Sequence, residues 1–258
     1  MIKFAYFLPI VIFVWFSTTF IITYVIAVLR KDVNPVFPYI SDSGAFSPES
    51  CIFGQMLNTG AILMVLFMYV RHRQIRFLCE KHSIHNSVRS KSIISVWFGA
   101  VAAFGVSVVA NFQETNVFIV HILGAIFSFG FGSVWQCFQT WISFKIVAYL
   151  GTVTLNRVRL ILCGISVSAF LISSFCGLIG LLYFKGEDPT KWNKNDGGFN
   201  FHIVSTITEW INAFGIVGFI LSFTPDLKNI SFEEPQIQIY EEIISESSAS
   251  SESVPVCY

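Results

Sequence analysis

Six long apolar stretches are the feature that most constrains how this chain folds. Each approaches or exceeds the roughly 20 residues that a helix needs to cross about 30 Å of hydrocarbon, and none contains a Lys or Arg. The stretches span residues 5–29, 52–70, 93–112, 118–144, 160–184 and 201–223. The sequence therefore predicts an all-α polytopic membrane protein, a bundle of six transmembrane helices.

Composition agrees with a chain that lies mostly in lipid. The mean hydropathy is +0.66 and only 12% of the residues are charged, unlike an average soluble domain. We expect a transmembrane domain over residues 1–224 and an acidic, Ser- and Glu-rich cytosolic tail over residues 225–258. The tail lacks a periodic apolar face, so it is predicted to be disordered.

Basic residues gather in the connections that follow the second and fourth stretches. They are Arg71, Arg73, Arg76, Lys81, Arg89, Lys91, Lys145, Arg157 and Arg159. By the positive-inside rule these connections face the cytosol, and an even number of spans then places both termini there. The loops 30–51 and 185–200 would lie on the opposite side, and the sequon at Asn229 should stay unglycosylated. The first stretch is too long for a signal-peptide core and is interpreted as an uncleaved anchor.

Polar residues within or next to the spans form the main candidate site. Glu209 is the only acidic residue deep in a predicted span, where an ionised carboxylate is costly without a partner. The other members of this candidate intramembrane cluster are His202, His121, Asn111, Gln113 and Glu114, all expected at one end of the bundle. Two interpretations stay open: a hydrogen-bonded cluster that fixes helix register, or a site for a lipid headgroup, an ion or a proton.

Small residues four apart recur in the middle spans. The pairs are Gly99/Ala103, Ser128/Gly132, Gly164/Ser168 and Ser173/Gly177. This spacing allows helix backbones to approach closely in lipid, so we interpret the pairs as packing positions. The first loop carries paired prolines at Pro35 and Pro38 and an Asp-Ser-Gly turn, which favour an ordered, extended structure.

No motif of the sequence indicates catalysis. A nucleotide loop, a nucleophile elbow, a zinc helix and a Cys/His metal spacing are all missing. We therefore expect no enzyme activity, no cofactor, no metal and no nucleic-acid partner. Membrane lipids are the expected partners, and the direct protein partners are open.

One short motif in the predicted tail suggests a trafficking role. Tyr240-Glu241-Glu242-Ile243 has the spacing of a peptide whose Tyr240 and Ile243 side chains fill two pockets of a clathrin adaptor. The alternatives are a phosphotyrosine docking site or no role.

Four segments, in order and spacing, resemble one known family. They are Phe-Pro-Tyr-Ile-Ser-Asp at 37–42, Pro-Glu-Ser-Cys-Ile-Phe-Gly at 48–54, Val-Val-Ala-Asn-Phe-Gln-Glu at 108–114, and His202 with Thr-Glu-Trp at 208–210. Together they resemble the DNA damage-regulated autophagy modulator family and cover nearly the whole transmembrane region. The chain is also similar to the broader superfamily, which includes scaffolds for phosphatidylinositol 4-kinase and a Golgi factor in GPI-anchor lipid remodelling.

The resemblance implies a function as well as a fold. It implies a six-helix protein of lysosomal or other endomembranes that promotes autophagy and connects it to cell death, without catalysis. Two alternatives stay open: a plasma-membrane scaffold for a phosphatidylinositol 4-kinase complex, and a transporter or lipid-modifying protein that uses the Glu209 cluster. The lysosomal membrane is the expected location, with the Golgi or plasma membrane as alternatives.

Overall fold

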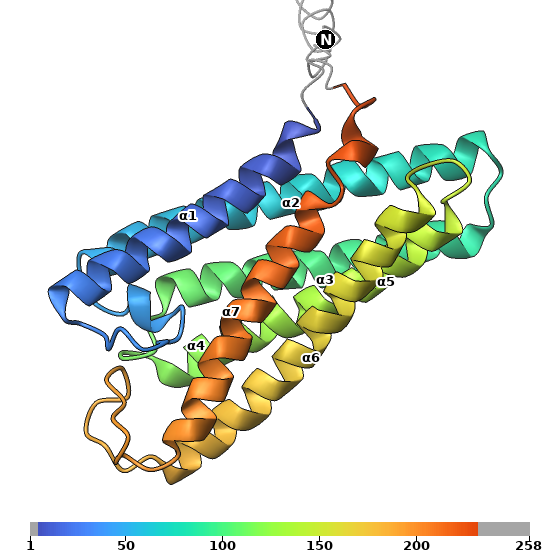
Figure 1. Ribbon diagram of the computed structural model, residues 1–258. Helices are drawn as coiled ribbons and strands as arrows, with labels where there is room; N and C mark the ends of the chain where they lie inside the picture. Colours follow the sequence, from blue (N-terminus) through green and yellow to red (C-terminus); the bar gives the residue numbers. More distant parts are fainter. Residues whose placement is uncertain (1–4, 232–258) are drawn as a thin grey trace, which may run out of the picture.

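The chain folds into a bundle of long helices (Figure 1). The computed structural model describes residues 5–231. The first, second, third, fifth and sixth spans are α1 (Phe7–Arg30), α2 (Glu49–Lys81), α3 (Asn86–Asn111), α6 (Val153–Tyr183) and α7 (Phe199–Leu221). The fourth span joins α4 (Phe118–Ala125), the π-helix η2 (Ile126–Phe131) and α5 (Gly132–Lys145). All six are long and apolar enough to cross a membrane, so the predicted all-α, six-span fold is confirmed.

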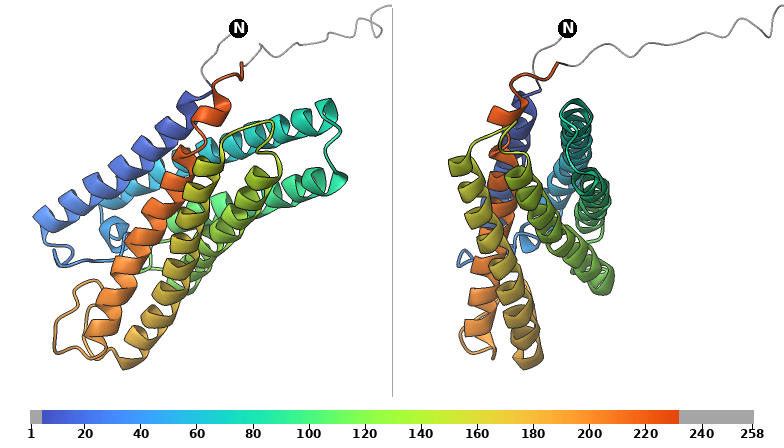
Figure 2. Two further views of the ribbon diagram at one scale, coloured as in Figure 1. Left: turned by 45° about the vertical axis from the view of Figure 1, so that its right-hand side comes forward. Right: turned by 90° about the vertical axis from the view of Figure 1, so that its right-hand side faces the viewer.

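The spans pack in a ring that follows their order in the sequence. Each span contacts the next one along the chain, and α7 closes the ring by packing against α1. The seam between the fourth and fifth spans is packed at α5 and η2, whereas α4 packs mainly on α3. Figure 2 shows α4 diverging from the paired α6 and α7 toward the end with the long loops.

Aromatic side chains occupy the centre of the ring. Trp135 of α5 is almost fully buried, and its ring lies 5.6 Å from that of Phe219 and 6.1 Å from that of Phe67. Half of the apolar part of α7 is buried, compared with 17% for α6. α7 is therefore the most buried of the six spans, and most of the surface of α6 is available to lipid.

The second helix continues well past its apolar stretch. α2 runs to Lys81 although hydropathy predicts a span that ends at residue 70. No Gly or Pro interrupts residues 71–81, so the charged residues end the apolar run without ending the helix. Arg71 and Arg159, expected in exposed connections, are instead helical and buried.

These two arginines converge on one carboxylate just after the last span. Oδ2 of Asp226 accepts hydrogen bonds from Nη1 of Arg71 at 3.3 Å and from Nη2 of Arg159 at 2.9 Å. Both guanidinium groups also lie over the ring of Phe223, at 4.6 and 3.9 Å from its centroid. We call Arg71, Arg159 and Asp226 the charge latch, because they connect α2, α6 and the segment that follows α7.

The latch includes one of the first residues of the predicted tail. Residues 225–227 form the short 3-10 helix η3 (Pro225–Leu227), in which Asp226 and Leu227 are buried. A buried ion pair and an apolar contact hold these three residues against the bundle. Residues 232–258, with Tyr240 and Ile243, lie outside the described residues.

Small residues bring the third and fourth spans close together at Gly105 and Gly124, which lie outside the predicted pairs. Among the predicted positions, Gly99 packs closely on Met68 and Gly177 on Ser205. A Cβ at Gly105 would lie only 2.7 Å from the carbonyl oxygen of Gly124, so no larger residue fits without a shift. The pair Gly164/Ser168 does not behave this way. Gly164 has no neighbouring atom within 4 Å of a Cβ position, and this face of α6 is exposed.

Candidate functional site

The first loop folds into the end of the bundle and supplies half of the candidate site. The indole Nε1 of Trp210 donates to the carbonyl oxygen of Pro38 at 2.9 Å, and Nδ2 of Asn34 donates to that of Trp192 at 2.8 Å. These bonds connect the loop to α7 and to the loop between α6 and α7. The expectation of an ordered loop is confirmed.

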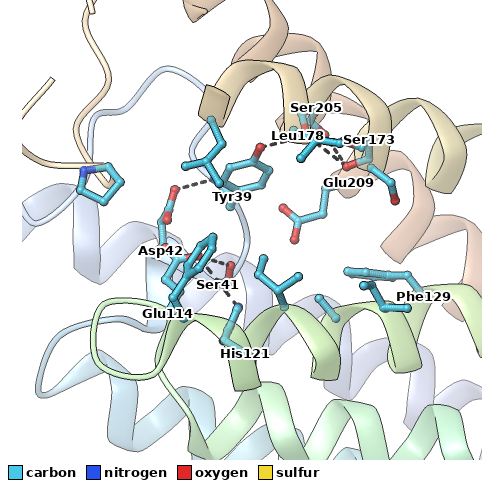
Figure 3. Close-up of a pocket in the computed structure, with 18 of the residues that line it drawn as sticks. Tyr39, Ser41, Asp42, Glu114, His121, Phe129, Ser173, Leu178, Ser205 and Glu209 are labelled. Carbon is cyan, nitrogen blue, oxygen red and sulfur yellow. Dashed lines mark hydrogen bonds and ion pairs between the residues drawn. The ribbon is translucent and has the colours of Figure 1, made fainter. Parts of the chain in front are cut away.

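Glu209 accepts a hydrogen bond from this loop rather than from another helix. Its Oε2 accepts from the backbone N–H of Ile40 at 3.0 Å, and the side chain is only 9% exposed. Figure 3 shows the carboxyl group pointing into a space bounded by the loop and α4. A helix residue in the sixth span thereby holds the first loop, 169 positions earlier in the sequence.

Glu114 and His121 lie across this space from Glu209 (Figure 3). The hydroxyl of Ser41 donates to Oε2 of Glu114 at 3.2 Å, and Nε2 of His121 lies 3.9 Å from the same oxygen. The Nδ1 of His121 is 2.7 Å from the carbonyl oxygen of Phe112, which accepts only, so Nδ1 carries a hydrogen. The other ring nitrogen, Nε2, is therefore the one that faces the carboxyl group of Glu114.

Asp42 adds a third carboxyl group to the same end of the bundle. It is 1% exposed, and its Oδ2 accepts from the backbone N–H of Tyr39 at 2.9 Å. Burial raises the pKa of Asp42 well above its ordinary value, and the nearby charge of Glu114 raises it further. Burial also raises the pKa of Tyr39, whose hydroxyl donates to Ser205 at 2.9 Å.

His202 is buried beside the site but outside its open space. Its ring stacks on Trp192 at 4.2 Å with an angle of 6° between the planes, and meets the ring of Tyr39 edge-on at 5.2 Å. The imidazole thus supports the loop residues that surround Glu209.

Two residues of the predicted cluster lie apart from it. Asn111 accepts from Asn58 at 3.1 Å and donates to the carbonyl oxygen of Ser107 at 2.6 Å, so it links α2 and α3 on an exposed face. Gln113 accepts from Asn116 within the turn before α4. The structure brings together Glu209, Glu114 and His121, with His202 next to them, and leaves Asn111 and Gln113 outside.

The space between these groups is a cavity of about 480 Å³. Its polar end is lined by Tyr39, Asp42, Glu114, His121 and Glu209, and its apolar end by side chains of α4, η2 and α6. A smaller space of about 70 Å³ shares Glu209 and His121 and extends toward the core. The larger volume falls within the range of about 300–1,000 Å³ that is common for small-molecule sites.

Sequence reasoning missed the contribution of the first loop. Tyr39, Ser41 and Asp42 stand in a connection that was expected to be ordered but was not joined to the cluster. One feature of the sequence could have indicated this. The first loop was expected on the same side of the membrane as the non-cytosolic ends of the third and sixth spans, which carry the cluster. Only the fold shows that the loop turns inward instead of covering the bundle from outside.

The chemistry available to this site is electrostatic and hydrogen-bonding. Three carboxyl groups and one imidazole face a cavity into which no Lys or Arg projects. In the part of the chain that the structure describes, no group of three or more His, Cys, Asp or Glu side chains has the arrangement of a metal site. The cavity therefore has the features of a binding pocket for a cationic or hydrogen-bond-donating group.

The fold and the cavity define a polytopic helical membrane protein with an acidic pocket between its spans. The chain belongs to the Frag1/DRAM/Sfk1/Cwh43p family, whose N-terminal domain matches residues 4–230. The resemblance noted from its motifs is thereby confirmed.

Relatives of known name are similar over most of their length. The chain is 34% identical over 228 residues to DNA damage-regulated autophagy modulator protein 2 of Homo sapiens, which covers 87% of this chain and 85% of the relative. It is 34% identical over 226 residues to DNA damage-regulated autophagy modulator protein 1 of Homo sapiens, covering 87% and 92%. It is 34% identical over 209 residues to the modulator of macroautophagy TMEM150B-B of Xenopus laevis, covering 80% and 78%. No solved structure matches the chain significantly.

Proposed function

We propose that this protein is a non-enzymatic modulator of autophagy in lysosomal or related endomembranes, and that it links autophagy to apoptosis. One observation carries the proposal. Three relatives that are named as modulators of autophagy or macroautophagy align with the chain over most of its transmembrane domain at 34% identity. The shared part is the six-span bundle with its loops, so the activity belongs to that bundle.

The proposed arrangement in the membrane follows the distribution of basic residues. Both termini lie in the cytosol, and the first loop and the loop between α6 and α7 face the lumen. The acidic end of the bundle then meets the lumenal side of the membrane. Tyr240 and Ile243 would act from the cytosolic side as a sorting signal for a clathrin adaptor.

Autophagic flux in cells tests the proposed function directly. Cells that lack the protein should turn over less autophagosomal cargo, measured with and without a block of lysosomal degradation, and the wild-type chain should restore it. Glu209→Leu should restore less than half as much, because it removes the acceptor for Ile40 and leaves a buried N–H unpaired. Glu187→Leu, at an exposed acidic residue of the loop after α6, is the control. Unchanged flux in cells without the protein would refute the function.

Location discriminates this proposal from the kinase-scaffold alternative. The tagged wild-type chain should colocalise with lysosomal markers, whereas Tyr240→Ala and Ile243→Ala should increase the surface pool. Gln238→Ala, in the same segment but outside the motif, should behave as wild type. Surface enrichment of the wild-type chain would favour the scaffold, and equal distribution of all variants would reject the sorting motif.

A further inference from the structure

The cavity is open toward the surrounding lipid rather than toward the ends of the bundle alone. Its rim includes Phe118 and Ile122 of α4, and Leu178 and Leu181 of α6, all between 38% and 59% exposed. α4 and α6 belong to neighbouring spans that diverge at this end of the ring (Figure 2). An apolar rim at a seam between two spans gives an alkyl chain a path from the hydrocarbon into the cavity.

The inner wall of the cavity has the opposite character. Glu209 reaches it with one oxygen bound to the N–H of Ile40 and the other without a hydrogen-bond donor. Asn212, one turn further along α7, lines the cavity, is 1% exposed and has no partner for its Oδ1. Asp42 likewise has an unpartnered Oδ1. Buried acceptors without donors are uncommon in folded proteins, and two of them, in Asn212 and Asp42, belong to the lining of one space.

The two unpartnered atoms are oxygens, and the lining carries three carboxyl groups and no Lys or Arg, so together these groups favour a cationic ligand. A phosphate or carboxylate would bring more acceptors to Glu209, Glu114 and Asp42 and would meet no Lys or Arg in the lining. A protonated amine brings up to three donors and a positive charge, and charge-assisted hydrogen bonds are about twice as strong as neutral ones. The aromatic rings of Tyr39 and Trp192 also line this end, and aromatic faces attract ammonium groups.

We propose that the cavity binds an amphiphile that carries a protonated amine head and an alkyl chain. The amine donates to the oxygens of Glu209 and Asn212, with Glu114 and Asp42 nearby, and the alkyl chain lies along Ile126 and Phe129 and leaves between α4 and α6. The carboxyl groups thus bind the amine of the ligand, and the apolar rim binds its alkyl chain. This site is independent of the role in autophagy proposed above.

Photo-crosslinking of the full-length chain in phosphatidylcholine nanodiscs tests the proposal. The probe is a photoactivatable octadecylamine with a clickable tag, and the adducts are mapped by mass spectrometry. Labelling should be saturable, should fall on peptides of α4 and α6 that line the cavity, and should be displaced by unlabelled octadecylamine. N-acetyl-octadecylamine, which has the same chain without the charge, should displace it at least about tenfold less well. Methylamine distinguishes a soluble amine from an amphiphile, and it should not displace the probe.

Matched variants separate the head site from the chain site. Glu209→Gln should lower the apparent affinity by about tenfold or more, whereas Glu49→Gln, at a buried acid at the start of α2 outside the cavity lining, should change it less than about twofold. Ser174→Trp places a large side chain in the cavity from α6 and should abolish labelling there. Leu171→Trp, 60% exposed on the same helix and outside the lining, should not.

Several outcomes would overturn the proposal. If N-acetyl-octadecylamine displaces the probe as well as octadecylamine does, binding does not depend on the positive charge. If methylamine displaces the probe, binding does not depend on the alkyl chain. Adducts spread over the outer faces of the helices would indicate contact with bulk lipid only. If Glu209→Gln fails to give a monodisperse protein, Ser174→Trp and the pair of competitors decide the question without it.

Discussion

At the scale of single residues, Asp42 determines how the site responds to pH. Because its pKa is raised in the folded state, the folded protein binds this proton more tightly than the unfolded chain does. The free energy of unfolding therefore falls as pH rises above the ordinary carboxyl pKa near 3.9 and toward the raised value. Burial is the main cause of the raised pKa, and the charges of Glu114 and Glu209 raise it further, whereas the hydrogen bond from the backbone N–H of Tyr39 lowers it.

Asp42→Asn should remove this dependence. The amide oxygen still accepts from the N–H of Tyr39, and no charge is buried, so the unfolding temperature at pH 7 should exceed that of the wild type. At pH 4 the two should converge. The unfolding temperatures of the purified wild type and variant, measured between pH 4 and pH 7, test this expectation. Glu187→Gln, at an exposed residue, is the control. A difference that does not change with pH would contradict the assignment.

At the scale of elements, the charge latch fixes the end of α7 against α2 and α6. Asp226 forms ion pairs with two buried arginines, Arg71 and Arg159. Asp226→Asn should destabilise the protein by about 3–5 kcal/mol, because it leaves two buried positive charges without a counter-charge. Asp188→Asn breaks an exposed pair with Lys191 at 3.8 Å and should cost less than about 1 kcal/mol. Similar unfolding midpoints for the two variants would argue against the latch.

The close contact between α3 and the fourth span depends on Gly105, which has no side chain. In Gly105→Ala the new Cβ would lie 2.7 Å from the carbonyl oxygen of Gly124 and from Cβ of Phe127. We expect a loss of about 1–3 kcal/mol from this overpacking, read as a lower unfolding temperature. Gly164→Ala is the control, because its Cβ meets open space. The hypothesis fails if both alanine variants unfold at the same temperature.

At the scale of the whole molecule, the distribution of basic residues predicts the orientation. A C-terminal tag should be digested when protease is added to intact lysosomes, because the proposed orientation places both termini in the cytosol. A glycosylation sequon inserted into the loop between α6 and α7 should be used, whereas Asn229 should not. Glycosylation at Asn229, or a tag that is cut only after the membrane is opened, would reverse the orientation.

The sequence by itself determined the number of spans and much of the family assignment. Length and hydropathy depend on local composition, so the six helices could be counted before any contact was known. Charged residues end an apolar run without ending a helix, which is why the extent of α2 and the burial of Arg71 could not be read from hydropathy.

Only the tertiary structure decided which polar residues meet. Glu209 and His121 were predicted to lie together and do, because both stand near the same end of their spans. Asn111 shares that end but points to Asn58 on another face, since the rotation of a helix depends on its neighbours. The hydrogen bonds of Glu209 with Ile40 and of Asp226 with Arg71 and Arg159 join segments that are distant in sequence, and such bonds form only when the helices have packed together.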